Sequence, residues 1–319
     1  MDGMQSAALG GRKQLIFAAG INSRSGDTRR LFGGFQHFLH AEGGYAPEDF
    51  LEATYGGEYA GGRWVGPAPY DMSAFDAPLA QSVAHCAQAL LWAARQRPAA
   101  GEWHLVGFSL GGLVLLEAAI VLHRRATDTW GQRLRSITTL SSPLNGCALG
   151  SFSWLGDLFG PGAIGPELCA LGDDPRHRRR LEADVAGLRA ASITVTTLVE
   201  ADDAVIQPTD GIVGPVRPDL VISSPAALDD SLVARHLGHG RIVHDPAVWR
   251  RLLLVVGPQR AGSPAPAAPV LAPRPLPPAP DQVLLMPPPA RDALLDLQLE
   301  ELKARMRAEG RLPETPPSA

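Results

Sequence analysis

The alternation of short β-rich runs with helical runs over the first 257 residues constrains the fold of this chain more than any other feature. Runs that predict strands cover residues 14–20, 50–56, 102–108, 134–142 and 192–200, and 219–223 is a further candidate. Runs that predict helices cover residues 76–96, 110–125, 176–190 and 245–255. Strands that alternate with helices pair in parallel and are covered by those helices. We therefore expect an α/β fold with a mostly parallel central sheet flanked by helices.

The composition is that of one large globular domain with appendages. The chain has 319 residues, of which 45% are hydrophobic and 19% are charged. Such a length can bury a single core of about 250 residues. We expect this main domain over residues 14–257, preceded by a flexible N-terminus at 1–13. The net charge of −4 gives no reason to expect a nucleic-acid partner.

Cysteine usage and hydropathy predict a cytoplasmic protein without a bound metal. The three cysteines have no metal-ligand spacing, and three is a poor number for a disulfide framework. No stretch reaches the ~18 uninterrupted apolar residues of a membrane span. The apolar residues before Gly10 and Gly11 are too few for a signal peptide. We expect no cofactor, no metal and no transmembrane segment.

A change in composition near residue 257 marks the end of the main domain. The next 32 residues, 258–289, contain 12 prolines and predict an extended linker. Apolar residues spaced as on one helix face follow the linker: Leu295, Leu299, Leu302 and Met306. They predict an amphipathic helix at 290–310, before a disordered end at 311–319. This helix either packs on its own domain or binds a protein partner or a second copy.

The stretch HLVGFSLGG places Ser109 between Gly107 and Gly111, in the pattern G-x-S-x-G. The pattern alone is weak in a chain with 34 glycines. Its position is informative, because the serine lies where a predicted strand passes directly into a predicted helix. That turn presents a hydroxyl above the carboxyl ends of the strands, beside the N–H groups of the helix N-terminus. Ser109 is therefore the candidate nucleophile.

A serine nucleophile needs a histidine base and an acid that orients it, and both are expected in loops after later strands. Asp202 and Asp203 directly follow the last long strand run, and we favour Asp203 with Asp202 as the alternative. Further on, the chain carries His236, His239 and His244. We favour His239 because it lies between two glycines, on a loop that can reach the serine.

Five segments together resemble the lipases of the α/β-hydrolase superfamily. They are LIFAAGINS (15–23), HLVGFSLGG (104–112), TLSSPLNG (139–146), ADDAVIQP (201–208) and GHGRIVHDPAVW (238–249). The similarity is greatest to the triacylglycerol-lipase-like and phosphatidylinositol-deacylase-like branches, and it covers about residues 14 to 256. In many lipases the acid loop has the form Asp-x-Val-Ile-x-Pro, which Asp203 begins here. The resemblance implies an α/β-hydrolase domain and a serine esterase.

The same resemblance implies an oxyanion hole made by two backbone N–H groups. One belongs to the residue after the glycine of the first strand's turn, which is Ile21 here. The other belongs to the residue after the nucleophile, Leu110. Lipases usually carry His-Gly in the first turn, whereas this chain has Ala19 and Gly20. The backbone donor survives that change, but the hydrogen bonds of the missing histidine do not.

A long connection follows TLSSP, and inserted segments at this point are caps in the family. We expect the cap at about residues 147–190. Its apolar side chains either line an acyl pocket or pack the cap onto the sheet: Phe152, Trp154, Leu155, Leu158, Phe159 and Ile164. An apolar cap favours a lipid or another hydrophobic ester as the substrate.

The function expected from the sequence is a serine hydrolase that cleaves carboxylic esters through an acyl-enzyme on Ser109. Two other interpretations stay open. The same three side chains also suit an acyltransferase or a thioesterase. In the second alternative, the domain is a non-catalytic scaffold that acts through the helix at 290–310.

Overall fold

The computed structural model describes residues 11–259, except 22, 72–73, 75, 99, 126–127, 148–163 and 226–237. The predicted N-terminus up to residue 10 and the predicted linker and helix beyond residue 259 lie outside these residues.

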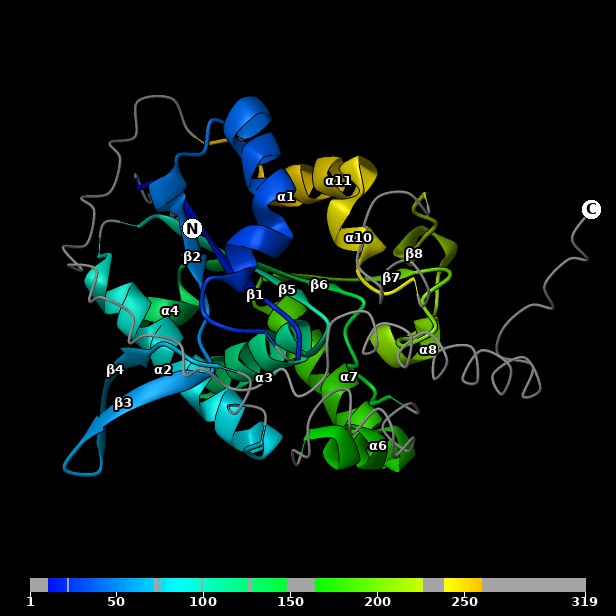
Figure 1. Cartoon of the computed structure of the whole chain (residues 1–319), viewed down its shortest axis with the longest axis horizontal. Coiled ribbons are helices and arrows are strands. Elements are labelled where there is room, and N and C mark those ends of the chain that lie inside the picture. The colour runs from blue at the N-terminus through cyan, green and yellow to red at the C-terminus, as the bar shows by residue number, and fades with distance from the viewer. Residues whose placement is uncertain are drawn as a thin grey trace, which may run out of the picture. The chain divides into compact units, whose positions relative to one another are not determined.

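The core of the described chain is a six-stranded sheet with the strand order β2-β1-β5-β6-β7-β8 (Figure 1). Its strands are β1 Lys13–Ala18, β2 Phe50–Glu52, β5 Glu102–Phe108, β6 Leu134–Leu140, β7 Thr194–Glu200 and β8 Val221–Ile222. Every neighbouring pair in this sheet is parallel. The prediction of an α/β fold with a mostly parallel sheet flanked by helices is confirmed.

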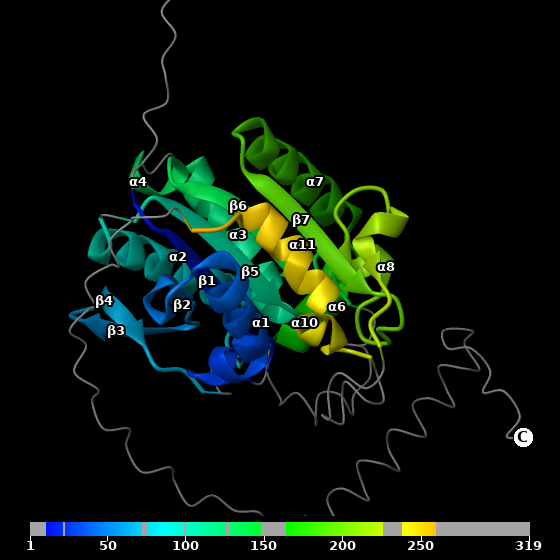
Figure 2. The same ribbon diagram turned by 90° about the horizontal axis from the view of Figure 1, so that it is seen from above.

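Helices cover both faces of the sheet (Figures 1 and 2). The longer ones are α1 Asp27–Gly43, α2 Leu79–Gln96, α3 Leu110–Arg124, α7 Pro175–Ala190 and α11 Pro246–Val256. On one face α1 packs against α11, and on the other α3 lies between α2 and α7. Short helices complete the described chain: η1 Pro47–Asp49, α4 Asp128–Gly131, α6 Ile164–Asp173, α8 Pro208–Gly211, η4 Pro218–Leu220 and α10 Arg241–His244. None of the described helices is long and apolar enough to cross a membrane.

The most buried elements are those that position Ser109. In β5 all residues after Glu102 are buried, and α3 is buried on nearly all sides. Such burial explains why both segments read as almost continuous apolar runs rather than amphipathic ones. The turn at Ser109 thus lies between two elements that are buried in the core.

Two elements differ from the prediction. The run 50–56 is not one strand: β2 ends at Glu52, and a separate antiparallel hairpin begins at Gly56. The hairpin consists of β3 Gly56–Ala60 and β4 Arg63–Ala68, joined by two glycines with φ of 57° and 75°. Positive φ at both positions is typical of a two-residue hairpin turn. Helix α1 was not predicted either, because its polar face carries Arg, His and Gly and weakens the periodic signal.

The second half of the segment expected as a cap covers the sheet. Helix α7 packs against β7 and α3. Its buried side chains Leu181, Val185 and Leu188 recur at spacings of four and three residues. Within the described part of the predicted insertion, α6 precedes α7.

A buried carboxylate joins the amino-terminal ends of the strands to their surroundings. The Asp49 side chain has no exposed surface and accepts hydrogen bonds from the Arg12 guanidinium, with Arg12 Nε at 2.9 Å. Gln14 Nε2 and the N–H of Ala46 donate to the same carboxylate. The hydrogen bonds from these donors offset the cost of burying the Asp49 charge. The donors in turn need this carboxylate as their acceptor.

Replacing the buried carboxylate by Asp49→Ala is expected to lower the free energy of unfolding by roughly 3–5 kcal/mol, because the guanidinium of Arg12, the side chain of Gln14 and the N–H of Ala46 lose the buried acceptor to which they donate. Urea denaturation followed by circular dichroism measures this loss. The exposed pair between Arg217 and Asp219 is the matched control, and Asp219→Ala should change stability far less. Equal losses in the two variants would contradict the role of Asp49.

Candidate active site

Ser109 occupies a strained turn between β5 and α3. Its backbone has φ of 53° and ψ of −133°, a conformation that residues with a Cβ rarely adopt. The glycines on either side allow this turn. A Cβ on Gly107 would press on the backbone of Gly112, and a Cβ on Gly111 would press on the carbonyl oxygen of Ala19. Neither position therefore has room for a side chain.

The structure brings Ser109, His239 and Asp203 into one hydrogen-bonded line. His239 Nε2 lies 3.0 Å from Ser109 Oγ, and His239 Nδ1 lies 2.8 Å from Asp203 Oδ2. An ionised carboxylate can only accept, so Nδ1 carries the proton of the neutral imidazole. Nε2 is then the acceptor that faces the serine hydroxyl.

Backbone N–H groups hold the Asp203 carboxylate in place. The N–H groups of Val205 and Ile206 both donate to Asp203 Oδ1 at 2.9 Å, which leaves Oδ2 for His239. The Asp203 side chain has no exposed surface. Asp202, the alternative acid, is exposed at the neighbouring position. Of the two carboxylates, Asp203 is the one that contacts the histidine.

Glycines and an aromatic ring set the position of His239. Gly238 and Gly240 have φ of 72° and 104°, and a Cβ on Gly238 would press on the carbonyl oxygen of Asp202. The loop therefore packs directly on the Asp203 turn. On another side of the imidazole, the ring of Phe108 lies with its centroid 4.8 Å away. His244 lies at the end of α10, and His236 lies outside the described residues.

The loop after β1 passes directly beside the serine. A Cβ on Gly20 would lie 2.8 Å from Ser109 Cβ and 3.2 Å from Ser109 Oγ. Ile21, one of the expected oxyanion donors, follows that glycine. Leu110, the other, is the first residue of α3, and the N–H of a first helical residue has no acceptor within its own helix. Both residues therefore lie next to the serine, one across the loop and one along the chain.

Only part of the predicted substrate pocket can be placed. Ile164 is fully buried at the start of α6. The other five residues proposed to line the pocket, Phe152, Trp154, Leu155, Leu158 and Phe159, lie outside the described residues. The described end of this segment packs closely, because the N–H of Cys147 donates to the carbonyl oxygen of Leu168.

Glu200 is a buried acid near the site that the sequence did not reveal. It ends β7 and has no exposed surface. Its Oε1 accepts the N–H of Ser224 at 2.9 Å, while Oε2 has no partner among the described residues. Burial raises the pKa of Glu200, and the nearby charge of Asp203 raises it further.

Metal chemistry has no candidate ligands in the part of the chain that the structure describes. No group of three or more His, Cys, Asp or Glu side chains is arranged there to hold an ion. None of the three cysteines forms a disulfide, and burial raises the pKa of Cys86 to about 12. Cys86 is thus an unreactive core thiol.

Known proteins resemble this chain in structure rather than in sequence. No protein-family model matches it, and no curated protein matches it either. Similar solved structures include phospholipase PlaB from Legionella pneumophila in complex with thio-NAD, at 12% identity and a TM-score of 0.46. That match covers 76% of this chain and 61% of the other, so this chain spans about three fifths of the phospholipase.

Two further similar structures are a lipase and a thioesterase. Bacillus licheniformis lipase BlEst2 is 12% identical, with 76% of this chain and 91% of the other covered and a TM-score of 0.47. RedJ, a thioesterase from the prodiginine biosynthetic pathway in Streptomyces coelicolor, is 20% identical, with 78% and 89% covered and a TM-score of 0.39. Because these scores are low, the fold assignment depends on the strand order and on the turn at Ser109.

Crowding at the serine turn predicts opposite effects for two glycine substitutions in helices. Gly111→Ala should lower the free energy of unfolding by roughly 1–3 kcal/mol, because the added methyl group meets the carbonyl oxygens of Ala18 and Ala19. Gly33→Ala in α1 has no atom within 4 Å of the new Cβ. It should leave stability unchanged or raise it by up to about 1 kcal/mol. Denaturant titrations compare the two, and a harmless Gly111→Ala would contradict the close approach.

The raised pKa of Glu200 predicts how stability depends on pH. The folded protein binds this proton more tightly than the unfolded chain, so stability due to Glu200 is present at low pH and lost as pH rises. The free energy of unfolding of Glu200→Gln should therefore rise relative to that of the unsubstituted protein as the pH increases from 4 to 8. Glu58→Gln, at an exposed position, is the control and should show no such trend. If the stability of Glu200→Gln relative to the unsubstituted protein fell as the pH rose, the prediction would be contradicted.

Proposed function

We propose that this protein is a serine hydrolase that cleaves carboxylic esters through an acyl-enzyme on Ser109. The observation that carries the proposal is the hydrogen-bonded line from Asp203 through His239 to Ser109. A hydroxyl within 3.0 Å of an unprotonated imidazole nitrogen is the arrangement required of an activated serine.

In the proposed reaction His239 Nε2 takes the Ser109 proton as Oγ attacks the ester carbonyl carbon. The carbonyl oxygen becomes an oxyanion, which the N–H groups of Leu110 and Ile21 stabilise. The intermediate then expels the alcohol, which receives the proton from His239 and leaves the acyl group on Ser109. A water molecule, deprotonated by His239 in turn, attacks this ester; the bond to Ser109 Oγ breaks, Oγ takes the proton back from His239, and the acid is released. Asp203 holds the imidazole in the required tautomer throughout.

Backbone strain favours catalysis over a scaffold role. Ser109 is buried at 7% exposure in a conformation that costs of order 1–3 kcal/mol. A scaffold gains nothing from that strain, whereas a nucleophile gains a hydroxyl aimed at the histidine. Strained residues of this kind cluster at active sites.

We infer a hydrophobic ester, such as a lipid, as the substrate class. Support comes from the segment after β6, whose sequence is rich in apolar side chains broken by glycine and proline. We also propose a reducing compartment such as the cytoplasm, consistent with three cysteines that form no disulfide.

Labelling by a fluorophosphonate probe tests the nucleophile. The unsubstituted protein is expected to gain one phosphonyl adduct by intact mass, and Ser109→Ala is expected to gain none. Failure of the folded, unsubstituted protein to react would contradict an activated serine at this turn.

Two neighbouring aspartates provide a matched test of the acid. With 4-nitrophenyl esters, Asp203→Asn should lower kcat on the order of 10³–10⁴-fold, because the imidazole then takes the wrong tautomer. Asp202→Asn should change kcat by less than about twofold, as expected for an exposed side chain. Equal losses in both variants would contradict the assignment of Asp203.

A further inference from the structure

We propose that Ser23 is a positioning residue that aims the Ile21 N–H at the oxyanion through a hydrogen bond to the Gly20 carbonyl. The proposal rests on the function proposed above. It assigns a task in the reaction to a residue outside the Ser109, His239 and Asp203 line.

Ser23 donates a hydrogen bond to the peptide unit that contains the Ile21 N–H. Ser23 Oγ lies 2.6 Å from the carbonyl oxygen of Gly20, and a carbonyl can only accept, so Ser23 is the donor. That carbonyl belongs to the same planar, trans peptide as the N–H of Ile21. In such a unit the C=O and N–H point in opposite directions. A hydrogen bond that sets the direction of the carbonyl therefore also sets the direction of the N–H.

The peptide that carries the other proposed oxyanion donor, Leu110, is anchored in the same way by a backbone hydrogen bond. The N–H of Leu110 shares a peptide unit with the carbonyl of Ser109, which accepts the N–H of Gly112 at 3.0 Å. The two donor peptides thus each have an anchored carbonyl. For Leu110 the anchor is a backbone group that follows from the helix, whereas for Ile21 it is a side chain that the sequence has to supply.

Tyr70 extends this chain of donors. Its hydroxyl lies 3.4 Å from Ser23 Oγ, and because the serine proton goes to Gly20, the tyrosine is the donor in this contact. Burial raises the pKa of Tyr70, which keeps its hydroxyl protonated. The order is Tyr70 to Ser23 to Gly20, and each bond polarises the next, which makes the Ile21 N–H a stronger donor.

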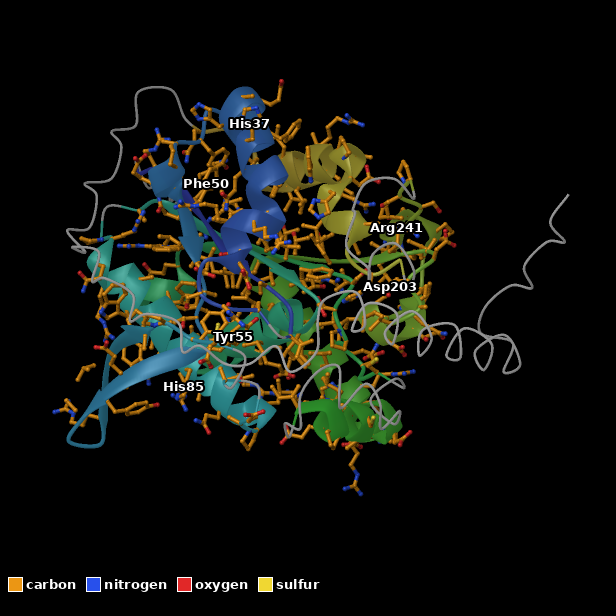
Figure 3. The ribbon with its side chains drawn as sticks, in the orientation of Figure 1. His37, Phe50, Tyr55, His85, Asp203 and Arg241 are labelled. Atoms are coloured by element: carbon orange, nitrogen blue, oxygen red, sulfur yellow. The ribbon has the colours of Figure 1, made fainter. Side chains whose placement is uncertain are left out.

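The aromatic surroundings restrict the same loop. The Tyr55 hydroxyl donates to the carbonyl oxygen of Ala19 at 2.5 Å, one peptide before the donor peptide. The rings of Tyr55 and Tyr70 pack edge to face, with centroids 4.9 Å apart. Tyr55 lies beside the start of the β3–β4 hairpin, where its backbone oxygen contacts His85 Nδ1 (Figure 3). Ser23 therefore acts on a loop whose neighbouring peptide cannot swing freely.

Ser25 provides a matched control two residues further along the loop. Its hydroxyl accepts the N–H of Tyr70 at 2.8 Å, and its own N–H donates to the Tyr70 carbonyl at 2.9 Å. Removing the Ser25 hydroxyl takes one bond from the loop but leaves the Gly20 carbonyl and its donor in place. Ser23 and Ser25 variants thus separate orientation of the Ile21 peptide from general loosening of the loop.

The test compares Ser23→Ala, Ser25→Ala and Ser23→Thr in the full-length protein with 4-nitrophenyl butyrate. Ser23→Ala is expected to lower kcat about 10- to 100-fold with KM nearly unchanged, because the oxyanion exists only in the transition state and intermediate. Ser23→Thr, which keeps the hydroxyl, should restore most of the activity. Ser25→Ala should stay within about threefold of the unsubstituted protein.

A second readout identifies the oxyanion as the affected group. A trifluoromethyl ketone adds to the serine as a tetrahedral oxyanion, so its inhibition constant should rise for Ser23→Ala by about the factor lost from kcat/KM. Loss of activity without a parallel loss of inhibitor affinity would overturn the proposal. If Ser23→Ala does not fold, Tyr70→Phe replaces it, and an unchanged inhibition constant in that variant would count against the chain of donors.

Failure of this inference can be told apart from failure of the proposed function. An inactive unsubstituted protein, or an active Ser109→Ala, overturns both. Turnover that is lost in Ser109→Ala but unchanged in Ser23→Ala overturns the role of Ser23 alone.

Discussion

The rest of the site depends on one steric constraint, the contact of two backbone segments at the carboxyl end of the sheet. The loop after β1 and the turn after β5 approach so closely that Gly20 and Gly111 have no room for a side chain. This contact forces Ser109 into its strained conformation and brings the Ile21 peptide beside it. Asp203 follows β7, which is separated from β5 by β6 alone. The proposed nucleophile, oxyanion donors and acid thus come from the loops after β1, β5 and β7 of one sheet.

Hydrogen bonds then fix the orientation of polar groups in this closely packed region. Asp203 is held by two backbone N–H groups before it contacts His239, and the Gly20 carbonyl is held by Ser23. In both cases one end of a polar group is hydrogen-bonded within the protein, which leaves its other end directed at the proposed reaction. Such preorganisation is what distinguishes a site that stabilises developing charge from one that must rearrange to do so.

Local patterns predicted much of the fold and of the candidate site. Strands, the turn at Ser109 and the loop at Asp203 carry short-range signals, because apolar runs, glycines and turn residues act within a few positions. Helix α1 and the β3–β4 hairpin were missed, since the polar residues of α1 and the glycines of the hairpin weaken the periodic signal. The partners of the β1–α1 loop could not be predicted at all. The Tyr55 hydroxyl donates to the carbonyl oxygen of Ala19, 36 residues away, and only the fold brings that pair together.

The spacing of the three aligned residues along the chain has a consequence for synthesis. Ser109 precedes His239 by 130 residues, and Asp203 precedes it by 36. During synthesis Ser109 therefore leaves the ribosome well before His239. His239 is followed directly by α10 and α11, the last helices that the structure describes. Because a serine hydroxyl without a base is a poor nucleophile, the proposed activity can begin only once His239 has been synthesised and the domain has folded around it.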